Sequence, residues 1–124
     1  MKLIQIICAL LVLTAVASAT VSHHDCSLDT MVLGSWKQDG MTIIQYAITI
    51  ENHTNKMIKS IHISTDHTLT LVDKSSIWNI EKQSNGDLTL PVGQPTIAPH
   101  SSLTFYCILK GTTRPNLYVK SISF

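Results

Sequence analysis

The stretch Thr42-Ile43-Ile44-Gln45-Tyr46-Ala47-Ile48-Thr49-Ile50-Glu51 decides how this chain can fold. Every second residue from Ile44 to Ile50 is large and apolar, and the residues between them are smaller or polar. Successive side chains of a β-strand point to opposite faces, so this alternation predicts a strand with one buried face. Its β-branched and aromatic residues also favour strands over helices.

The same alternation recurs toward the C-terminus, most clearly from Leu103 to Leu109. Asn85-Gly86-Asp87 is a strong turn signal, and the proline- and glycine-containing stretch 91–100 predicts a loop. Further strands are predicted at residues 57–65, 69–72, 77–80, 88–90 and 117–124. Many short strands with no helical period after the first residues predict an all-β protein, a single antiparallel β-sandwich of the immunoglobulin-like or jelly-roll type.

The chain begins like a secretory leader. Lys2 precedes an almost wholly apolar run from Leu3 to Val16, and Ala17-Ser18-Ala19 supplies the small residues that a signal peptidase reads. The run is too short for a stable membrane span. We expect a cleaved signal peptide at residues 1–19, a patternless and flexible lead-in at 20–34, and one domain at 35–124.

Charge narrows the classes of partner. Without Lys2, the nine basic residues fall to eight, which equals the number of acidic residues, so the expected mature chain is neutral. Nucleic acid and anionic membranes attract proteins with a basic excess, so neither is an expected partner.

Two cysteines, Cys26 and Cys107, remain after the expected leader. In an oxidising compartment, a pair of cysteines predicts one disulfide. The alternative is that Cys107 is a small buried hydrophobe and Cys26 is free or pairs with another chain.

Asn52-His53-Thr54 is an acceptor sequon for N-glycosylation in a predicted exposed turn. We expect a glycan on Asn52, and the alternative is a sequon that is not used.

The sequence carries no constellation typical of an enzyme. Glycoside hydrolysis needs two positioned carboxylates, and no pair stands out among the acidic residues, most of which fall in predicted turns or at strand ends. No signature of a nucleophilic triad is present. His23-His24-Asp25 falls short of a four-ligand structural zinc site and is interpreted as a polar tail. We therefore expect no catalytic residue, no metal and no cofactor.

The two tryptophans are more informative. Trp36 and Trp78 both have polar neighbours in the sequence rather than apolar runs. An exposed tryptophan can stack its flat face on a sugar ring while its N–H bonds a hydroxyl. A tryptophan that covers one end of the core would have the same sequence signature, so the residues alone leave both roles open.

An ordered set of landmarks resembles carbohydrate-binding module family 49, which occurs at the C-terminal end of certain plant cellulases. The likeness covers residues 34–124. Its landmarks are Ser35-Trp36, Gly40, the segment Tyr46 to Thr54, Ile58-Lys59-Ser60-Ile61, Ile77-Trp78, Leu90-Pro91 and the segment Ile97 to Tyr106.

The resemblance implies a β-sandwich that binds cellulose through a planar strip of aromatic side chains. Trp36 and Trp78 match positions of that strip. Tyr46 aligns with a family aromatic, although its alternation with Ile44 and Ile48 favours the core. Val92 stands where the family usually has a tryptophan, which implies a weaker hold on a flat crystalline surface.

Together these observations predict a non-catalytic secreted protein that binds a polysaccharide, cellulose or a related β-glucan, through Trp36, Trp78 and Tyr46. The resemblance favours a wall, coat or matrix component, with other matrix proteins as further candidate partners. The alternative is a secreted β-sandwich module for protein binding or adhesion.

Overall fold

The computed structural model describes residues 25–124 and has no helix in that range. The predicted signal peptide, residues 20–24 of the predicted lead-in and the histidine pair lie outside the described residues. The eight strands are β1 (Cys26–Gln38), β2 (Met41–Asn52), β3 (Ser60–Ser64), β4 (Ile77–Trp78), β5 (Glu81–Lys82), β6 (Leu88–Thr89), β7 (Ser102–Lys110) and β8 (Tyr118–Ser123). A helix long and apolar enough to cross a membrane does not occur in this part of the chain.

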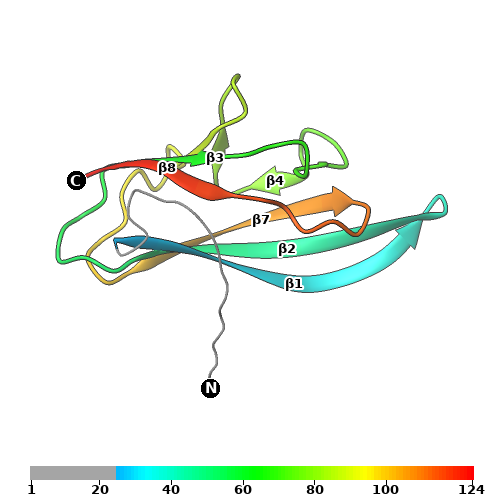
Figure 1. Ribbon diagram of the computed structural model, residues 1–124, viewed down its shortest axis with the longest axis horizontal. Helices are drawn as coiled ribbons and strands as arrows, with labels where there is room; N and C mark the ends of the chain where they lie inside the picture. The colour runs from blue at the N-terminus through cyan, green and yellow to red at the C-terminus, as the bar shows by residue number, and fades with distance from the viewer. Residues whose placement is uncertain (1–24) are drawn as a thin grey trace, which may run out of the picture.

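The strands form two antiparallel four-stranded sheets, which confirms the predicted β-sandwich (Figure 1). One sheet has the order β1-β2-β7-β4 and contains the three longest strands. The other has the order β5-β6-β3-β8 and is built from short strands. The long sheet is therefore the broader and more regular of the two surfaces.

The core lies between the sheets and follows the alternation seen in the sequence. Even-numbered residues of β2 and odd-numbered residues of β7 point inward, with Ile48 paired opposite Phe105 and both fully buried. The opposite layer contributes Ile61, Ile63 and Leu88. Each such side chain contributes about 1.5–3 kcal/mol when it is fully removed from water.

β1 corrects the prediction of a flexible lead-in, because residues 26–34 are strand. β1 pairs with β2 along its whole length, from Cys26 opposite Asn52 to Gln38 opposite Met41. A β-bulge between Val32 and Gly34 shifts the register by one residue. The strand was missed because it lies at a sheet edge and is exposed over most of its length, so the apolar residues show no clean alternation.

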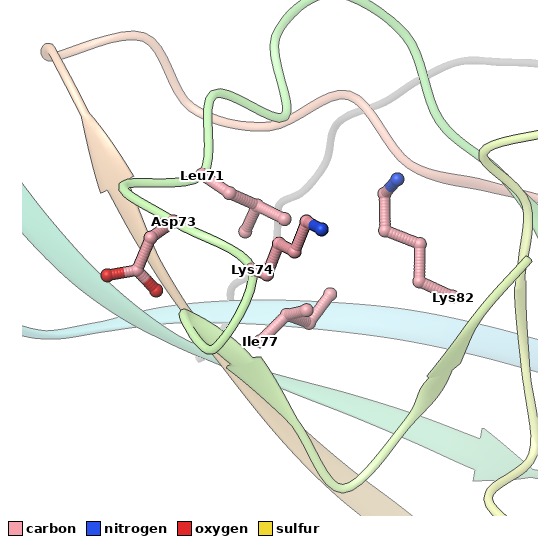
Figure 2. Close-up of a pocket in the computed structure, with 5 residues that line it drawn as sticks. All are labelled: Leu71, Asp73, Lys74, Ile77 and Lys82. Atoms are coloured by element: carbon pink, nitrogen blue, oxygen red, sulfur yellow. The ribbon is translucent and has the colours of Figure 1, made fainter. Parts of the chain in front are cut away.

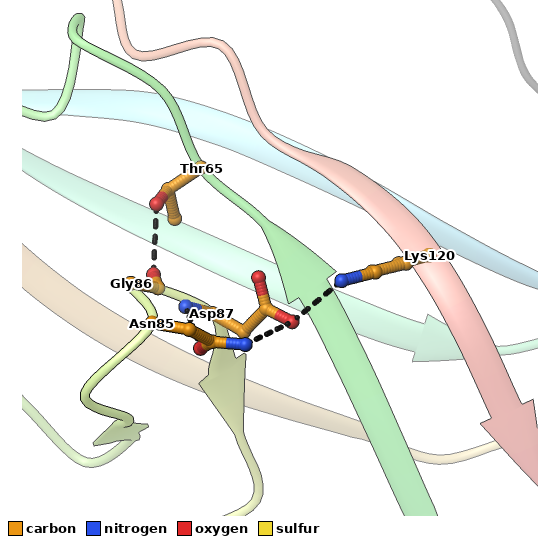
Figure 3. Close-up of polar contacts among 5 residues, drawn as sticks. All are labelled: Thr65, Asn85, Gly86, Asp87 and Lys120. Carbon is orange, nitrogen blue, oxygen red and sulfur yellow. Dashed lines mark hydrogen bonds and ion pairs between the residues drawn. The ribbon is translucent and has the colours of Figure 1, made fainter.

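The predicted strand at residues 69–72 is reduced to one isolated bridge between Leu71 and Leu109. The predicted turn at residues 85–87 is confirmed, with Gly86 in the left-handed region at φ 95°. This turn is tied to its surroundings by side chains (Figure 3). The Thr65 hydroxyl donates to the Gly86 carbonyl at 2.7 Å, and Lys120 Nζ lies 3.1 Å from Asp87 Oδ2. The Lys120 contact links the start of β6 to β8 across β3.

Candidate functional site

The outer face of the β1-β2-β7-β4 sheet carries both tryptophans. Residues directly opposite each other in a sheet share a face. Trp36 is opposite Ile43, which is an outward residue of β2, and Trp78 is opposite Tyr106, which is an outward residue of β7. Each tryptophan is 40% exposed. Their place on the outer face of the sheet, away from the space between the two sheets, argues against the alternative in which a tryptophan covers one end of the core.

Trp78 stacks on Tyr106 from the neighbouring strand. The ring centroids are 5.6 Å apart and the ring planes differ by 21°. The sequence prediction did not include Tyr106 among the site residues. The signal was present, because Tyr106 lies between the buried Phe105 and Cys107 and must therefore point away from the core.

An apolar floor lies between the aromatic residues. Ile43 and Ala47 point outward but are buried beneath their neighbours on the same face. Met31, which is opposite Ala47, extends the row formed by Tyr106 and Trp78 toward the edge of the sheet. The outer face is therefore a broad surface with apolar cover rather than a deep cleft.

The two tryptophans mark opposite sides of this surface. They are separated by three strand spacings and by four residues along β2, from Ile43 to Ala47. At the usual dimensions of a sheet this places their backbones about 20 Å apart. Such a distance is much longer than one aromatic ring, so any ligand that touches both must be extended.

Polar groups follow the aromatic row toward one end of the sheet. The hydroxyls of Thr49 and Thr104 bond each other at 2.9 Å. Beyond them, Glu51, His53, His100 and Ser102 line a small polar pocket of about 220 Å³ with Asn52 and Ser101. The candidate face thus combines an aromatic region with a rim of hydroxyl, carboxylate and imidazole groups that can exchange hydrogen bonds with a ligand.

Tyr46 does not belong to this face. It is only 2% exposed and packs in the core cluster with Ile48 and Cys107. Its inclusion among the predicted carbohydrate-binding residues was wrong. The alternation with Ile44 and Ile48 was the better guide, because period two places all three residues on the inward face.

Asn52 is buried and not available to a glycan in the folded chain. Its side chain is 1% exposed, and Nδ2 donates to the carbonyls of Lys56, Ile97 and Ala98 at 2.8–3.1 Å. Oδ1 accepts from the Thr54 backbone N–H and hydroxyl. The predicted exposure of Asn52 was wrong, because the Asn-x-Thr sequence closes a turn here with both of its polar side chains.

The predicted disulfide is also contradicted. Both cysteines are free and buried. Cys26 is opposite Asn52 and Cys107 is opposite Tyr46, so they lie six residues apart along β2 on two different neighbouring strands. That separation is about 20 Å, whereas a disulfide needs Cα atoms within about 7 Å. Burial raises the pKa of both thiols to about 12, and nearby Asp25 and Glu51 add to the shift at Cys26.

A second cavity, of about 450 Å³, opens beside β4 (Figure 2). Leu71 and Ile77 form its apolar wall, and Lys74 and Lys82 direct their amino groups toward the same space. Its single carboxylate, Asp73, points away and is bonded by Ser75 and Ser76. One carboxylate held in its own turn does not supply the acid and base of a hydrolase.

Within residues 25–124, no group of three or more His, Cys, Asp and Glu side chains is placed to hold a metal ion.

Comparison with known proteins finds a matching family and similar chains. Residues 26–110 match the family described as carbohydrate binding domain CBM49. Stalk-specific protein A and Stalk-specific protein B of Dictyostelium discoideum are 49% and 48% identical to this chain over 106 residues. Each match covers 82% of this chain and 68% of the relative.

Two crystal structures of a GH20 exo β-N-acetylglucosaminidase from Vibrio harveyi are also similar, one in complex with N-acetylglucosamine and one an inactive mutant. Both have a TM-score of 0.54 and 15% sequence identity. The match covers 77% of this chain but only 17% of the enzyme. At this identity the likeness shows a shared fold and nothing about activity.

Proposed function

This chain belongs to the CBM49 family of carbohydrate-binding domains, and on that premise we propose that its outer β1-β2-β7-β4 face binds a polysaccharide, cellulose or a related β-glucan. The observation that carries the proposal is the stacked pair Trp78–Tyr106 on the same exposed face as Trp36. Aromatic rings offer a flat apolar surface to the apolar face of a sugar ring, and the indole N–H can bond a hydroxyl.

The shape of the face supports an extended ligand. Small molecules usually bind in concave pockets that enclose most of their surface. Here the aromatic residues are spread over a sheet built from three long strands, with Trp36 on one edge strand and Trp78 on the other. A polymer that lies across the sheet can reach both, whereas a single sugar cannot.

We propose a binding role without catalysis. Two acidic residues, Asp29 and Glu51, point outward from β1 and β2 near the polar end of the face. Both are solvent-exposed, and hydrolysis requires an apolar setting that keeps one carboxyl protonated as the general acid. Neither residue has such a setting, so the carboxylates are assigned to hydrogen bonding at the rim.

The same proposal places the protein outside the cell, in a wall, coat or matrix. Its support is the leader-like sequence of residues 1–19 and the identity with two relatives named for the stalk. Other matrix proteins remain candidate partners under this proposal.

A pull-down with microcrystalline cellulose, with chitin as the comparison, tests the proposed ligand. Retention on cellulose that is lost on Trp78→Ala supports the proposal. A protein that stays in the supernatant with both polymers contradicts it.

A further inference from the structure

The free edge of β1 carries an apolar run that the candidate binding face does not explain. Met31, Val32 and Leu33 are 59%, 51% and 49% exposed. Three consecutive exposed apolar residues are unusual on a soluble surface unless they have a function. In the described part of the chain, β2 is the only strand that pairs with β1. An unpaired strand edge is a template for pairing with another strand.

The hydrogen bonds show which backbone groups of β1 face this free edge. Asn52 N–H donates to Ser101 and Gly111 N–H donates to Thr42, so the even-numbered residues of β2 direct their backbone groups toward β7. The β1 residues opposite those even-numbered positions must then direct their N–H and C=O groups away from β2. These residues are Leu28, Thr30, Val32, Ser35 and Lys37. The guanidinium of Arg114 donates to the Thr30 carbonyl at 2.6 Å, which confirms the direction for Thr30.

The bulge makes this set of residues complementary to itself. Because the register shifts between Val32 and Gly34, the residues whose backbone groups point to the free edge have even numbers before the bulge and odd numbers after it. Two antiparallel β1 strands related by a two-fold axis between Leu33 and Gly34 then place Val32 opposite Ser35 and Thr30 opposite Lys37. In each of these pairs both residues direct their backbone groups at the other strand, as a hydrogen-bonded pair requires. The Thr30 carbonyl already accepts from Arg114, so the Thr30–Lys37 pair requires that Arg114 moves aside or shares this carbonyl.

The side chains agree with the same register. Met31 of one copy lies opposite Trp36 of the other, and both point to the outer face of their sheet. Asp29 lies opposite Gln38 and Lys37 lies opposite Thr30, so no like charges meet across the axis. A closed two-fold contact of this kind uses the same surface on both partners.

We propose that the partner of this edge is a second copy of the chain, and that two molecules join β1 to β1 in this register. The two long sheets then form one continuous eight-stranded sheet, with the two outer faces side by side. The contact is stabilised by burial of the Met31 and Val32 side chains and by the new backbone hydrogen bonds between the two copies. The inference rests on the edge of β1 alone and holds whether or not the outer face binds a polysaccharide.

Sedimentation velocity of the purified protein, without any sugar, from about 10 μM to about 1 mM tests the proposal. A reversible monomer–dimer equilibrium is expected. Ser35→Pro removes an N–H that faces the free edge and follows Gly34, so the single chain should tolerate it. Val32→Lys places a charge beside the axis. Each change should raise the dissociation constant at least about tenfold, whereas the matched change Val92→Lys, in an exposed loop, should leave it unaltered.

Amide hydrogen exchange reports on the register itself. The N–H groups of Val32 and Ser35 should become protected as the protein concentration rises, while those of Met31 and Trp36, which face β2, should be protected throughout. A protein that stays monomeric over the whole range overturns the proposal. A dimer that survives both Ser35→Pro and Val32→Lys with unchanged affinity also overturns it, because another surface must then hold the copies together.

Discussion

Trp78 and Tyr106 lie on neighbouring strands with their rings stacked, 5.6 Å between centroids and 21° between planes. The pair joins a two-residue edge strand to the middle of the long sheet. Trp78 is 40% exposed and Tyr106 is half-buried, so Trp78 is the ring of the pair that is more open to solvent on the outer face.

Removal of either ring should weaken polysaccharide binding more than it weakens the fold. Trp78→Ala and Tyr106→Ala are each expected to reduce binding by about 1–3 kcal/mol, from the loss of aromatic contact area discounted for ordering costs. The lost stacking itself should reduce the free energy of unfolding by only about 0.5–1.5 kcal/mol. Depletion isotherms on cellulose and thermal melts measure the two quantities. Tyr118→Ala, on an exposed position of the other sheet, is the control and should leave binding unchanged.

Trp36 should contribute to binding independently of the stacked pair. Because it lies about 20 Å from Trp78 across the sheet, the effects of Trp36→Ala and Trp78→Ala should add in the double variant. Binding should also persist at high salt, since no charge pair is assigned to the contact. Loss of binding on Trp78→Ala with no effect of Trp36→Ala would restrict the site to the β4 side of the sheet.

Asn52 should act as a structural residue and carry no glycan. Asn52→Ala removes the donor to three carbonyls and is expected to lower the free energy of unfolding by about 2–4 kcal/mol. Thr54→Ser, which keeps the hydroxyl that bonds Asn52, is the matched control and should be much milder. Urea unfolding measures both variants. Intact mass of the protein, produced in a host that glycosylates exported chains, checks the modification, and a glycan mass at Asn52 would contradict this prediction.

The buried cysteines should be unreactive in the folded protein. With both pKa values raised to about 12, neither thiol ionises near neutral pH, and the thiolate is the reactive form. Iodoacetamide should therefore modify Cys26 and Cys107 only after denaturation. This modification should need no reducing agent, because the two thiols are free. A peptide containing Cys26 linked to Cys107 in the non-reduced digest would contradict the strand register.

Acid should destabilise the fold through two turn carboxylates. Hydrogen bonds from the Thr68 hydroxyl and backbone lower the pKa of Asp66, and those from Ser75 lower the pKa of Asp73, both from the ordinary value of 3.8. A carboxyl group whose pKa is lower in the folded state than in the unfolded state stabilises the fold at pH values above its unfolded-state pKa. This stabilisation is lost as the pH falls through its folded-state pKa. The free energy of unfolding should therefore decrease when the pH is lowered below about 4. Asp66→Asn and Asp73→Asn should each make the free energy of unfolding, measured with urea, less dependent on pH in this range. If both variants lose stability with acid as steeply as the unchanged protein, other groups cause the loss.

Several features of this protein could be predicted because they depend on neighbours along the chain. Alternation with period two identified β2 and β7 and the inward direction of Ile48 and Phe105, and the Asn85-Gly86 pair located a turn. The same local rule, applied to Tyr106 between two buried residues, would have found the third aromatic residue of the outer face. The alternation rule did not identify the edge strand β1, because a strand with little burial on either face has no alternation of apolar and polar residues.

The sequence by itself determined the all-β class, the composition of the core and the resemblance to a carbohydrate-binding family. Only the tertiary structure decided that Asn52 is buried, that the two cysteines lie about 20 Å apart, and that Trp36, Trp78 and Tyr106 share one face. The physical reason is that side-chain alternation is a local property of the extended backbone, whereas strand order and register follow from pairings between distant segments. Those pairings set which residues meet, and no pattern within one strand records them.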